Sequence, residues 1–316
     1  MKPFAFVFPG QGSQAVGMLD AWGDHPAVRD TLAEASAALG EDLGALIAQG
    51  PKEALALTTN TQPVMLVAGV ASWRAWRAEG GALPAAVAGH SLGEYSALVA
   101  AEVLTLAQAV PLVRLRAAAM QQAVPVGTGA MAAILGLDAQ KVIAGCAEAT
   151  AAMGQAGAEV VEAVNFNDPA QTVIAGSKAA VDKACEVLKG LGAKRALPLP
   201  VSAPFHSSLM KPAAEQLKAA LAALELGAPR IPVVNNIDVA VEQEADRIRD
   251  ALYRQAFGPV RWVECVQKIR ALGIDTVVEC GPGKVLAGMT KRIDAGLTGA
   301  ALYDPATLAE VKALLG

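Results

Sequence analysis

The stretch of sequence that decides the fold is AAVAGHSLGEYSALVA, residues 85–100. A short apolar run typical of a buried strand breaks at GHSLG, residues 89–93, and an apolar-periodic helix follows. A serine between two glycines at a strand-to-helix turn is the pattern of a nucleophile elbow, which lifts the serine hydroxyl clear of the sheet. The pattern predicts Ser91 as the nucleophile and the Leu92 N–H, at the positive end of the helix, as an oxyanion donor. The alternative is a plain glycine-rich turn, because five-residue motifs also occur by chance.

Composition and charge exclude several classes of protein. The 316 residues are 53% hydrophobic and 18% charged, which is ample for a sizeable core. A net charge of -4 gives no electrostatic footprint for nucleic acid or an anionic membrane, so neither is expected as a partner. The apolar runs are too short for a signal peptide or a membrane span, which predicts a cytoplasmic protein. The four cysteines stand far apart without histidines at ligand spacing, so we expect neither a disulfide framework nor a metal site.

Strands and helices alternate along most of the chain, which predicts an α/β fold whose large domain has a parallel, α/β-hydrolase-like sheet. FAFVF, residues 4–8, is typical of a strand buried on both faces, and the turn PGQGSQ follows where open α/β sheets bind ligands. The other expected elements of this domain are helices at residues 26–47, 62–77, 105–123, 208–224, 245–255 and 260–272, strands at 231–235 and 276–279, and a helix with a short terminal segment from 284 onward.

One segment interrupts this alternation. Strands expected at residues 131–137, 161–167, 172–175 and 194–199 and helices at 138–153 and 177–191 follow the order β-α-β-β-α-β. This order describes a ferredoxin-like subdomain. The sequence Gly-Thr-Gly before the segment and a cluster of prolines after it are typical of boundaries. We therefore expect a large domain of residues 1–127 and 200–316 with an inserted small subdomain of residues 128–199.

A serine hydroxyl needs a base, and the chain offers only three histidines. His90 is adjacent to Ser91 in a sharp turn that separates the two side chains, so we expect it to pack or hydrogen-bond locally. His25 stands at the start of a surface helix. His206 follows a strand and Pro204, where catalytic loops of α/β sheets lie, and elimination favours it as the base. The alternative for His206 is a loop histidine without a role.

The acids between Ser91 and His206 argue against a standard triad. They fall mostly in the elbow helix or in the inserted segment, and include Asp138, Asp168 and Asp182. A hydrolase triad would need a carboxylate on the main sheet. We therefore expect a neutral group, such as a backbone carbonyl, to orient His206.

The helix expected at residues 105–123 carries an arginine beside its apolar face. At about 100° per residue, Arg116 lies roughly 60° from Val113, at the flank of that face. Such an arginine either snorkels to solvent or points into a pocket, and snorkelling is the commoner outcome. Pro111 is expected to kink this helix or to delay its start.

Six ordered motifs cover nearly the whole chain. They are FPGQGSQ at residues 8–14, TQP at 61–63, GHSLGEYSALVA at 89–100, RxxxMQxAVPxGTGAM at 116–131, NFNxPxQxVIAG at 165–176 and GPGKVL at 281–286. Together they resemble the malonyl-CoA:acyl carrier protein transacylases of bacterial fatty acid synthesis. The series is far more specific than any single motif.

The resemblance implies the members of a catalytic dyad. Ser91 would be the nucleophile that takes the malonyl group, and His206 the general base toward the serine and later toward the incoming thiol. Gln255 matches the family position whose main-chain carbonyl steadies the histidine.

The resemblance also implies the groups that bind the substrate. The backbone N–H groups of Gln11 and Leu92 would form the oxyanion hole, and Gln62 would line the same pocket. Arg116 would bind the free carboxylate of malonate in a bidentate pair, which a planar guanidinium suits better than an ammonium. Phe205 stands where several bacterial members carry serine, and it is similar to the malonyl-selective type of polyketide acyltransferase.

The implied activity is transfer of a malonyl group from malonyl-CoA to the phosphopantetheine thiol of an acyl carrier protein, through a malonyl-serine intermediate. Malonyl-CoA and coenzyme A are then substrate and product, no permanently bound cofactor is expected, and the protein is expected to be a monomer. A serine esterase or thioesterase is the first rival, and it would pair His206 with a carboxylate without needing Arg116. A module that only docks a carrier protein would have no use for an intact Ser91. A trans-acting acyltransferase of polyketide synthesis is not distinguished by these residues.

Overall fold

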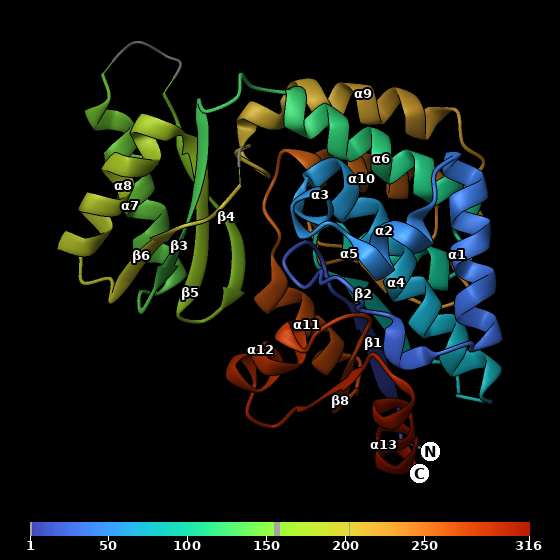
Figure 1. Ribbon diagram of the computed structural model, residues 1–316. Helices are drawn as coiled ribbons and strands as arrows, with labels where there is room; N and C mark the ends of the chain where they lie inside the picture. The colour runs from blue at the N-terminus through green and yellow to red at the C-terminus, as the bar shows by residue number, and fades with distance from the viewer. Residues whose placement is uncertain (1, 155–158, 202) are drawn as a thin grey trace.

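The computed structural model describes residues 2–154, 159–201 and 203–316, and its strands form two separate sheets (Figure 1). The parallel sheet has the order β7 (Val233–Val234), β2 (Ala86–Gly89), β1 (Phe4–Phe8), β8 (Thr276–Cys280) and β9 (Thr298–Leu302). The antiparallel sheet has the order β4 (Val161–Asp168), β5 (Gln171–Ser177), β3 (Gly129–Leu135) and β6 (Arg195–Pro198). The predicted α/β fold with a parallel sheet is therefore confirmed.

Helices cover both faces of the parallel sheet. The larger hydrophobic cluster includes side chains of α1 (Pro26–Leu39), α2 (Leu43–Gln49), α3 (Lys52–Ala56), α4 (Thr58–Ala78), α5 (Gly93–Ala100), α6 (Leu106–Gln122), α9 (Lys211–Ala222), α10 (Ala245–Ala256) and α13 (Pro305–Leu315), and of the 3-10 helices η1 (Asp20–Trp22) and η2 (Ser208–Met210). The opposite face packs against α11 (Trp262–Ala271) and α12 (Val285–Ile293). Burial on both faces explains why the strands are continuously apolar.

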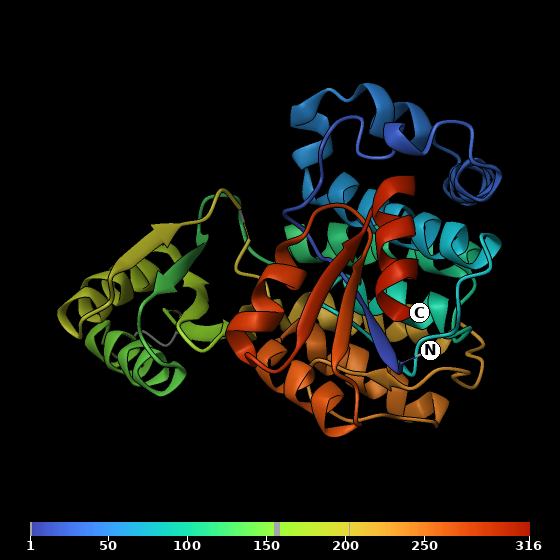
Figure 2. The same cartoon turned by 90° about the horizontal axis from the view of Figure 1, so that it is seen from below.

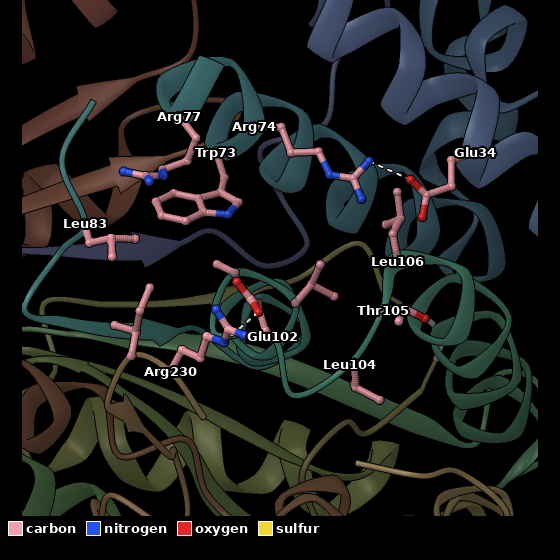
Figure 3. Close-up of a pocket in the computed structure, with 13 residues that line it drawn as sticks. Glu34, Trp73, Arg74, Arg77, Leu83, Glu102, Leu104, Thr105, Leu106 and Arg230 are labelled. Carbon is pink, nitrogen blue, oxygen red and sulfur yellow. Dashed lines mark hydrogen bonds and ion pairs between the residues drawn. The ribbon is translucent and has the colours of Figure 1, made fainter. Parts of the chain in front are cut away.

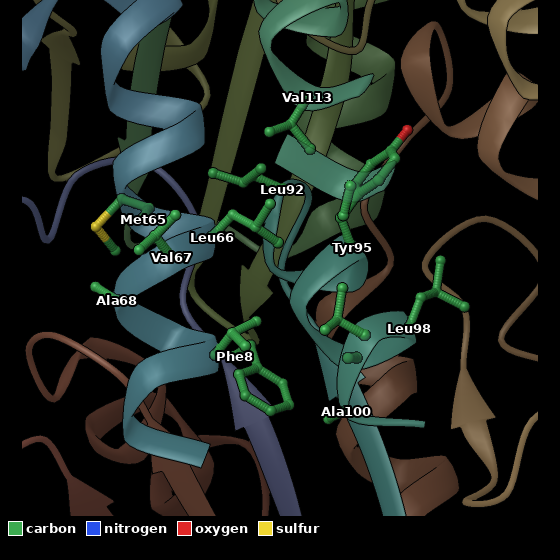
Figure 4. Packing of buried hydrophobic residues seen from close by; sticks show 14 of the residues in the cluster. Phe8, Met65, Leu66, Val67, Ala68, Leu92, Tyr95, Leu98, Ala100 and Val113 are labelled. Carbon is green, nitrogen blue, oxygen red and sulfur yellow. The ribbon is translucent and has the colours of Figure 1, made fainter. Parts of the chain in front are cut away.

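The two faces of strand β1 carry side chains of different size. Its three phenylalanines belong to the cluster with α4 and α5, whereas Ala5 and Val7 belong to the cluster with α11 and α12. Figure 4 shows Phe8, at the end of this strand, between the side chains of α4 and α5. Strand β8 pairs with β1 in the parallel sheet. The two ends of the chain lie close together in both ribbon views (Figures 1 and 2). The strand that leads to the PGQGSQ turn is thus fixed at the centre of the sheet.

The elbow between β2 and α5 depends on two glycines that leave no room for a side chain. A Cβ on Gly93 would lie 2.0 Å from the Phe8 carbonyl oxygen, and one on Gly89 would lie 1.9 Å from the Gly93 carbonyl carbon. Both distances are far below van der Waals contact. The turn can therefore cross the end of β1 only with glycine at both positions.

The antiparallel sheet lies apart from the parallel one and carries α7 (Ala139–Ala152) and α8 (Lys178–Gly190) (Figures 1 and 2). Its elements follow the order β3-α7-β4-β5-α8-β6, as expected from the sequence. Strand β4 joins this unit to the rest, because the Phe166 N–H donates to the Val260 carbonyl at 3.0 Å and the Val260 N–H to the Val164 carbonyl at 2.8 Å. An ion pair of 2.9 Å between Arg292 and Asp168 adds a second link.

Two expected helices differ in their limits. The helix expected at residues 26–47 is divided into α1 and α2, because Gly40 is left-handed at φ 71° and Asp42 accepts from the Ala45 N–H as a new cap. Helix α6 begins before Pro111 and continues through it, so the proline does not delay it. A capping box of Thr105 and Gln108 stabilises that early start.

The end of the chain holds more structure than the sequence predicted. Strand β9 and helix α13 occupy a region for which only a short terminal segment was expected. The sequence of β9, TGAAL, has little β-propensity and no clear apolar alternation. Its strand conformation comes from parallel pairing with β8, which no local pattern encodes.

Gly93→Ala is expected to lower the free energy of unfolding by about 3 kcal/mol, since the new Cβ would collide with the backbone of β1. Urea denaturation followed by circular dichroism measures the change. Gly190→Ala is the matched control, because a Cβ there meets nothing within 4 Å. It should alter the free energy by less than about 1 kcal/mol. Equal effects of the two variants would contradict the packing argument.

Candidate active site

Three segments bring a serine and a histidine into hydrogen-bond contact. Ser91 stands on the elbow, His206 in the loop between β6 and η2, and Gln255 near the end of α10. Ser91 Oγ lies 2.7 Å from His206 Nε2, and His206 Nδ1 lies 2.8 Å from the main-chain oxygen of Gln255. Because a carbonyl oxygen only accepts, Nδ1 carries the proton and Nε2 accepts the serine hydroxyl. The arrangement is a Ser-His pair oriented by a neutral group.

Burial keeps the histidine neutral. His206 is 4% exposed, and desolvation, reinforced by the positive charge of Arg116, lowers its pKa to about 3. The hydrogen bond to the Gln255 carbonyl acts in the opposite direction and is outweighed. The imidazole can therefore accept a proton from Ser91 throughout the neutral pH range.

Arg116 points into the protein, as the resemblance implied, and does not snorkel to solvent, the commoner outcome for such a position. It is 2% exposed, and its guanidinium donates to Gln62 Oε1 at 2.7 Å, to Ser91 Oγ at 3.1 Å and to Gln255 Oε1 at 3.1 Å. All three acceptors are neutral, and the ring of Tyr95 lies 5.4 Å away. Within the described ranges no carboxylate forms an ion pair with Arg116. A buried, unpaired cation beside a nucleophile is a site for an anionic group.

A cavity of about 120 Å³ opens in front of these side chains. The large unit and the small one both contribute to its wall, which is formed by Gln11, Gln62, His90, Ser91, Leu92, Arg116, Met120, Met131, Asn165, Leu199, Val201, Phe205 and His206. Polar groups gather at the serine and the arginine, and apolar side chains cover the remaining wall. The space suits a small acyl group with one charged end.

The turn after β1 lies against the elbow. A Cβ on Gly10 would come within 2.6 Å of the His90 carbonyl oxygen, so the two backbones are in close contact and Gln11 reaches the cavity. Leu92, at the N-terminus of α5, lines the same space. Among the residues that the structure describes, no hydrogen bond occupies the main-chain N–H of Gln11 or of Leu92. Both donors are available to an oxygen atom bound near Ser91.

Two polar residues that the sequence did not point to support the elbow. Asn236, after β7, accepts from the Ser91 N–H and donates to the Gly89 carbonyl, both at 2.8 Å. These bonds stabilise the left-handed backbone of Ser91, whose φ is 52°. Glu94 accepts from the Asn236 N–H at 2.8 Å and from Gln255 Nε2 at 3.0 Å. The available signal was position, since Asn236 follows a strand at the carboxyl edge of the sheet, where ligand sites gather.

His90 does not interact locally, so the expectation from the sequence is wrong. Its Nε2 lies 2.8 Å from Oδ1 of Asn167, which belongs to β4 of the antiparallel sheet. Its ring packs on Trp262 with centroids 5.5 Å apart. Burial lowers the pKa of His90, and the side chain connects the elbow to the small unit rather than serving as a base. His25 directly precedes α1, as expected, but it is partly buried and its side chain makes no capping hydrogen bond.

A larger pocket lies at the opposite ends of α4 and α5, and its volume is about 700 Å³. Figure 3 shows Arg74 paired with Glu34 and Arg230 paired with Glu102 across it. Arg74 and Arg230 are thus already paired with carboxylates, in contrast to Arg116, and Arg77 donates to the Gly81 carbonyl and lies over the ring of Trp73. The smaller cavity is therefore the candidate active site.

Comparison with known proteins shows the family of the chain. The acyl transferase domain family matches residues 5–302. The malonyl CoA-acyl carrier protein transacylase of Salmonella typhimurium is 56% identical over 309 residues, which are 98% of each chain. The chain belongs to the malonyl CoA-acyl carrier protein transacylase family. It is an acyltransferase.

Solved structures of this transacylase family have the same fold. The acyl-carrier-protein S-malonyltransferase of Burkholderia pseudomallei superposes with a TM-score of 0.95 at 65% identity, covering 98% of this chain and 99% of that one. A malonyl-transacylase in complex with its type II PKS acyl-carrier protein has a TM-score of 0.94 at 52% identity, with 98% of each chain covered. Within the described part of the chain, no helix combines the length and hydropathy that a membrane crossing requires.

Asn236→Leu is expected to destabilise the protein by about 1–3 kcal/mol, because it leaves the partly buried Ser91 N–H without its acceptor. It should also slow acylation of Ser91 in the molecules that remain folded, since the elbow loses its support. Denaturation gives the first effect and labelling of Ser91, followed by mass spectrometry, gives the second. Asn60→Leu is the control, because the side chain of Asn60 bonds to Ala54 and Arg114, away from the elbow. It should change stability without changing the rate of labelling.

Proposed function

We propose that this acyltransferase moves a malonyl group from malonyl-CoA to the phosphopantetheine thiol of an acyl carrier protein, through an ester on Ser91. The single observation that carries the proposal is the buried guanidinium of Arg116, which lies 3.1 Å from Ser91 Oγ and lacks an ion-pair partner among the described residues. Malonyl is a small acyl group with its own carboxylate, and it supplies the missing anion. The names of the relatives support the same substrate.

In the first half-reaction, Ser91 gives its hydroxyl proton to His206 Nε2 while Oγ forms a bond to the thioester carbon. The carbonyl oxygen becomes an oxyanion, and the N–H groups of Gln11 and Leu92 stabilise it. The C–S bond then breaks. The proton on Nε2 passes to the sulfur, so coenzyme A leaves as the thiol and a malonyl-serine ester remains.

In the second half-reaction, the phosphopantetheine thiol of the carrier protein takes the place of coenzyme A. His206 accepts the thiol proton, the sulfur attacks the ester carbon, and the C–O bond to Ser91 breaks. The proton returns to Ser91 Oγ. The main-chain carbonyl of Gln255 keeps the imidazole in the same tautomer during both steps.

Arg116 binds the malonyl carboxylate, and Gln62 orients the guanidinium through the bond to its Oε1. Binding also activates the base. The charge of Arg116 lowers the pKa of His206, and a carboxylate that offsets this charge raises the pKa again. The substrate therefore increases the basicity of the histidine that it needs. Phe205, in the cavity wall, restricts the space for an α-methyl branch and favours malonyl over methylmalonyl.

A hydrolase is the alternative from a different class. It would pair His206 with a carboxylate, whereas a main-chain carbonyl occupies Nδ1 in this chain. It would also have no need of a buried arginine in the acyl cavity. On this proposal the transfer serves bacterial fatty acid synthesis. Polyketide synthesis is the competing assignment, because a related transacylase forms a complex with a type II PKS acyl-carrier protein.

The proposal includes the organisation of the chain. Residues 128–199 form an inserted ferredoxin-like subdomain, and residues 1–127 and 200–316 form the α/β-hydrolase-like domain. The order of strands β4-β5-β3-β6 with two helices supports the first part, and the parallel sheet with its elbow supports the second. We further propose a monomeric, cytoplasmic enzyme without a permanently bound cofactor, which contacts neither nucleic acid nor membranes.

Incubation with malonyl-CoA should add one malonyl group to Ser91, detected by mass spectrometry of the intact protein and of its peptides. Ser91→Ala should carry no adduct, because no other hydroxyl lies against His206 Nε2 among the described residues. Water should release the group slowly and a holo carrier protein quickly. Rapid release by water alone would favour the hydrolase.

Arg116→Ala should reduce malonyl transfer by about a hundredfold or more, the effect of losing a buried charge-assisted pair. Transfer of acetyl, which has no carboxylate, should fall much less. The ratio of the two kcat/KM values is the measurement. An equal loss for both substrates would remove the proposed contact with malonate.

A further inference from the structure

One residue, Gln255, contacts Ser91, His206 and Arg116. The main-chain oxygen of Gln255 accepts from His206, its Oε1 accepts from Arg116 at 3.1 Å, and its Nε2 donates to the Ser91 carbonyl at 3.0 Å. Gln255 is fully buried. Its amide therefore has to keep one orientation, because exchanging oxygen and nitrogen would place an N–H against the guanidinium of Arg116.

Glu94 is one of the groups that hold the amide in that orientation. Its Oε2 accepts from Gln255 Nε2 at 3.0 Å, and the same oxygen accepts from the Asn236 N–H at 2.8 Å. A carboxylate oxygen cannot bond to the amide oxygen of Gln255, so Nε2 must face Glu94 and Oε1 must face Arg116. The main-chain bond from Asn236 fixes the carboxylate itself. Glu94 thus does not touch the substrate itself, and Gln255 connects it to the groups that do.

We propose that Glu94 is a positioning residue for the transfer: its carboxylate holds the amide of Gln255, and through it the guanidinium of Arg116 and the imidazole of His206, in line with Ser91. This inference rests on the proposed function. It also assigns a use to a buried acid that does not touch the histidine. Glu94 is 2% exposed, and a buried carboxylate without a role would be a net cost to stability.

The ionisation of Glu94 gives the proposal a signature. Desolvation raises the pKa of Glu94 to about 7, against the bonds from Asn236 and Gln255 and the charge of Arg116, which lower it. The titratable and charged groups around it are Arg116, Tyr95, Asp238, Glu242, Cys265 and, across Gln255, His206. Of these, burial lowers the pKa of His206 to about 3 in the protein without substrate and raises the pKa of Tyr95 to about 12. A change of rate near pH 7 that is present in the wild-type chain and absent from Glu94→Gln is therefore assigned to Glu94.

The direction of the pH dependence follows from the hydrogen bonds that Glu94 accepts. Above pH 7 the ionised carboxylate makes two charge-assisted bonds, which are roughly twice as strong as neutral ones. Below pH 7 the proton weakens them, and Gln255 is held less firmly. The rate of malonyl-serine formation should therefore fall as the pH drops through about 7. Glu94→Gln keeps an oxygen acceptor but removes the charge, so it mimics the protonated form at every pH.

The experiment measures the rate of malonyl-Ser91 formation by rapid quench and mass spectrometry, from pH 5.5 to 9, at several malonyl-CoA concentrations. Glu94→Gln should lower the maximal rate about tenfold at pH 8 and leave KM nearly unchanged, as expected for weaker alignment of the reacting groups. Its profile should lack the inflection near pH 7. Glu279→Gln is the matched control, since Glu279 is also buried with its pKa raised to about 7 but bonds to Ala287. It should retain both the rate and the inflection.

A second variant tests the route through the amide. Gln255→Leu keeps the main-chain carbonyl but removes the side-chain amide, so it should be slow and lack the inflection, and adding Glu94→Gln should slow it no further. An inflection that survives in Glu94→Gln, or in Gln255→Leu if the first variant does not fold, would overturn the inference. So would additive effects in the double variant. Failure of the proposed function looks different, because the wild-type chain would then form no malonyl-serine at any pH.

Discussion

The arrangement of the site depends on one constraint, which is a guanidinium buried without a carboxylate in contact. Desolvation lowers the pKa of Arg116 and would strongly destabilise its charge if nothing compensated it. The protein compensates with neutral acceptors on Gln62 and Gln255, the face of Tyr95, and the more distant charge of Glu94. These partners hold the cation but leave it able to bind a substrate anion. A direct ion pair would have closed the site.

The same constraint explains why the catalytic pair has no third, acidic member. A carboxylate on His206 Nδ1 would raise the basicity of the imidazole, but it would also stand close to Arg116 and compete with the substrate for the guanidinium. A main-chain carbonyl at 2.8 Å fixes the tautomer without adding charge. The carboxylate is instead moved behind Gln255, where an amide separates it from both His206 and Arg116.

The sequence predicted the parts of the site that local pattern encodes. The elbow around Ser91 follows from two glycines between a strand and a helix, and His206 followed from the small number of histidines. The inward direction of Arg116 did not follow from helical periodicity, because a position at the flank of an apolar face allows either outcome. Asn236 and Glu94 act through partners more than 140 residues apart in sequence, which only the sheet brings together. Strand β9 was missed for the same reason, since pairing with β8 creates it.

The cavity itself is a property of both sheets. Met131 belongs to the antiparallel unit, yet it lines the same space as Ser91 and Arg116. That unit is held by the backbone bonds of β4 to Val260, and its contact with the elbow runs through His90 and Asn167. His90 is the neighbour of the nucleophile, so a shift of the small unit would reach the elbow directly. The size of the acyl pocket is therefore set by the junction between the two units as much as by the residues that carry out the chemistry.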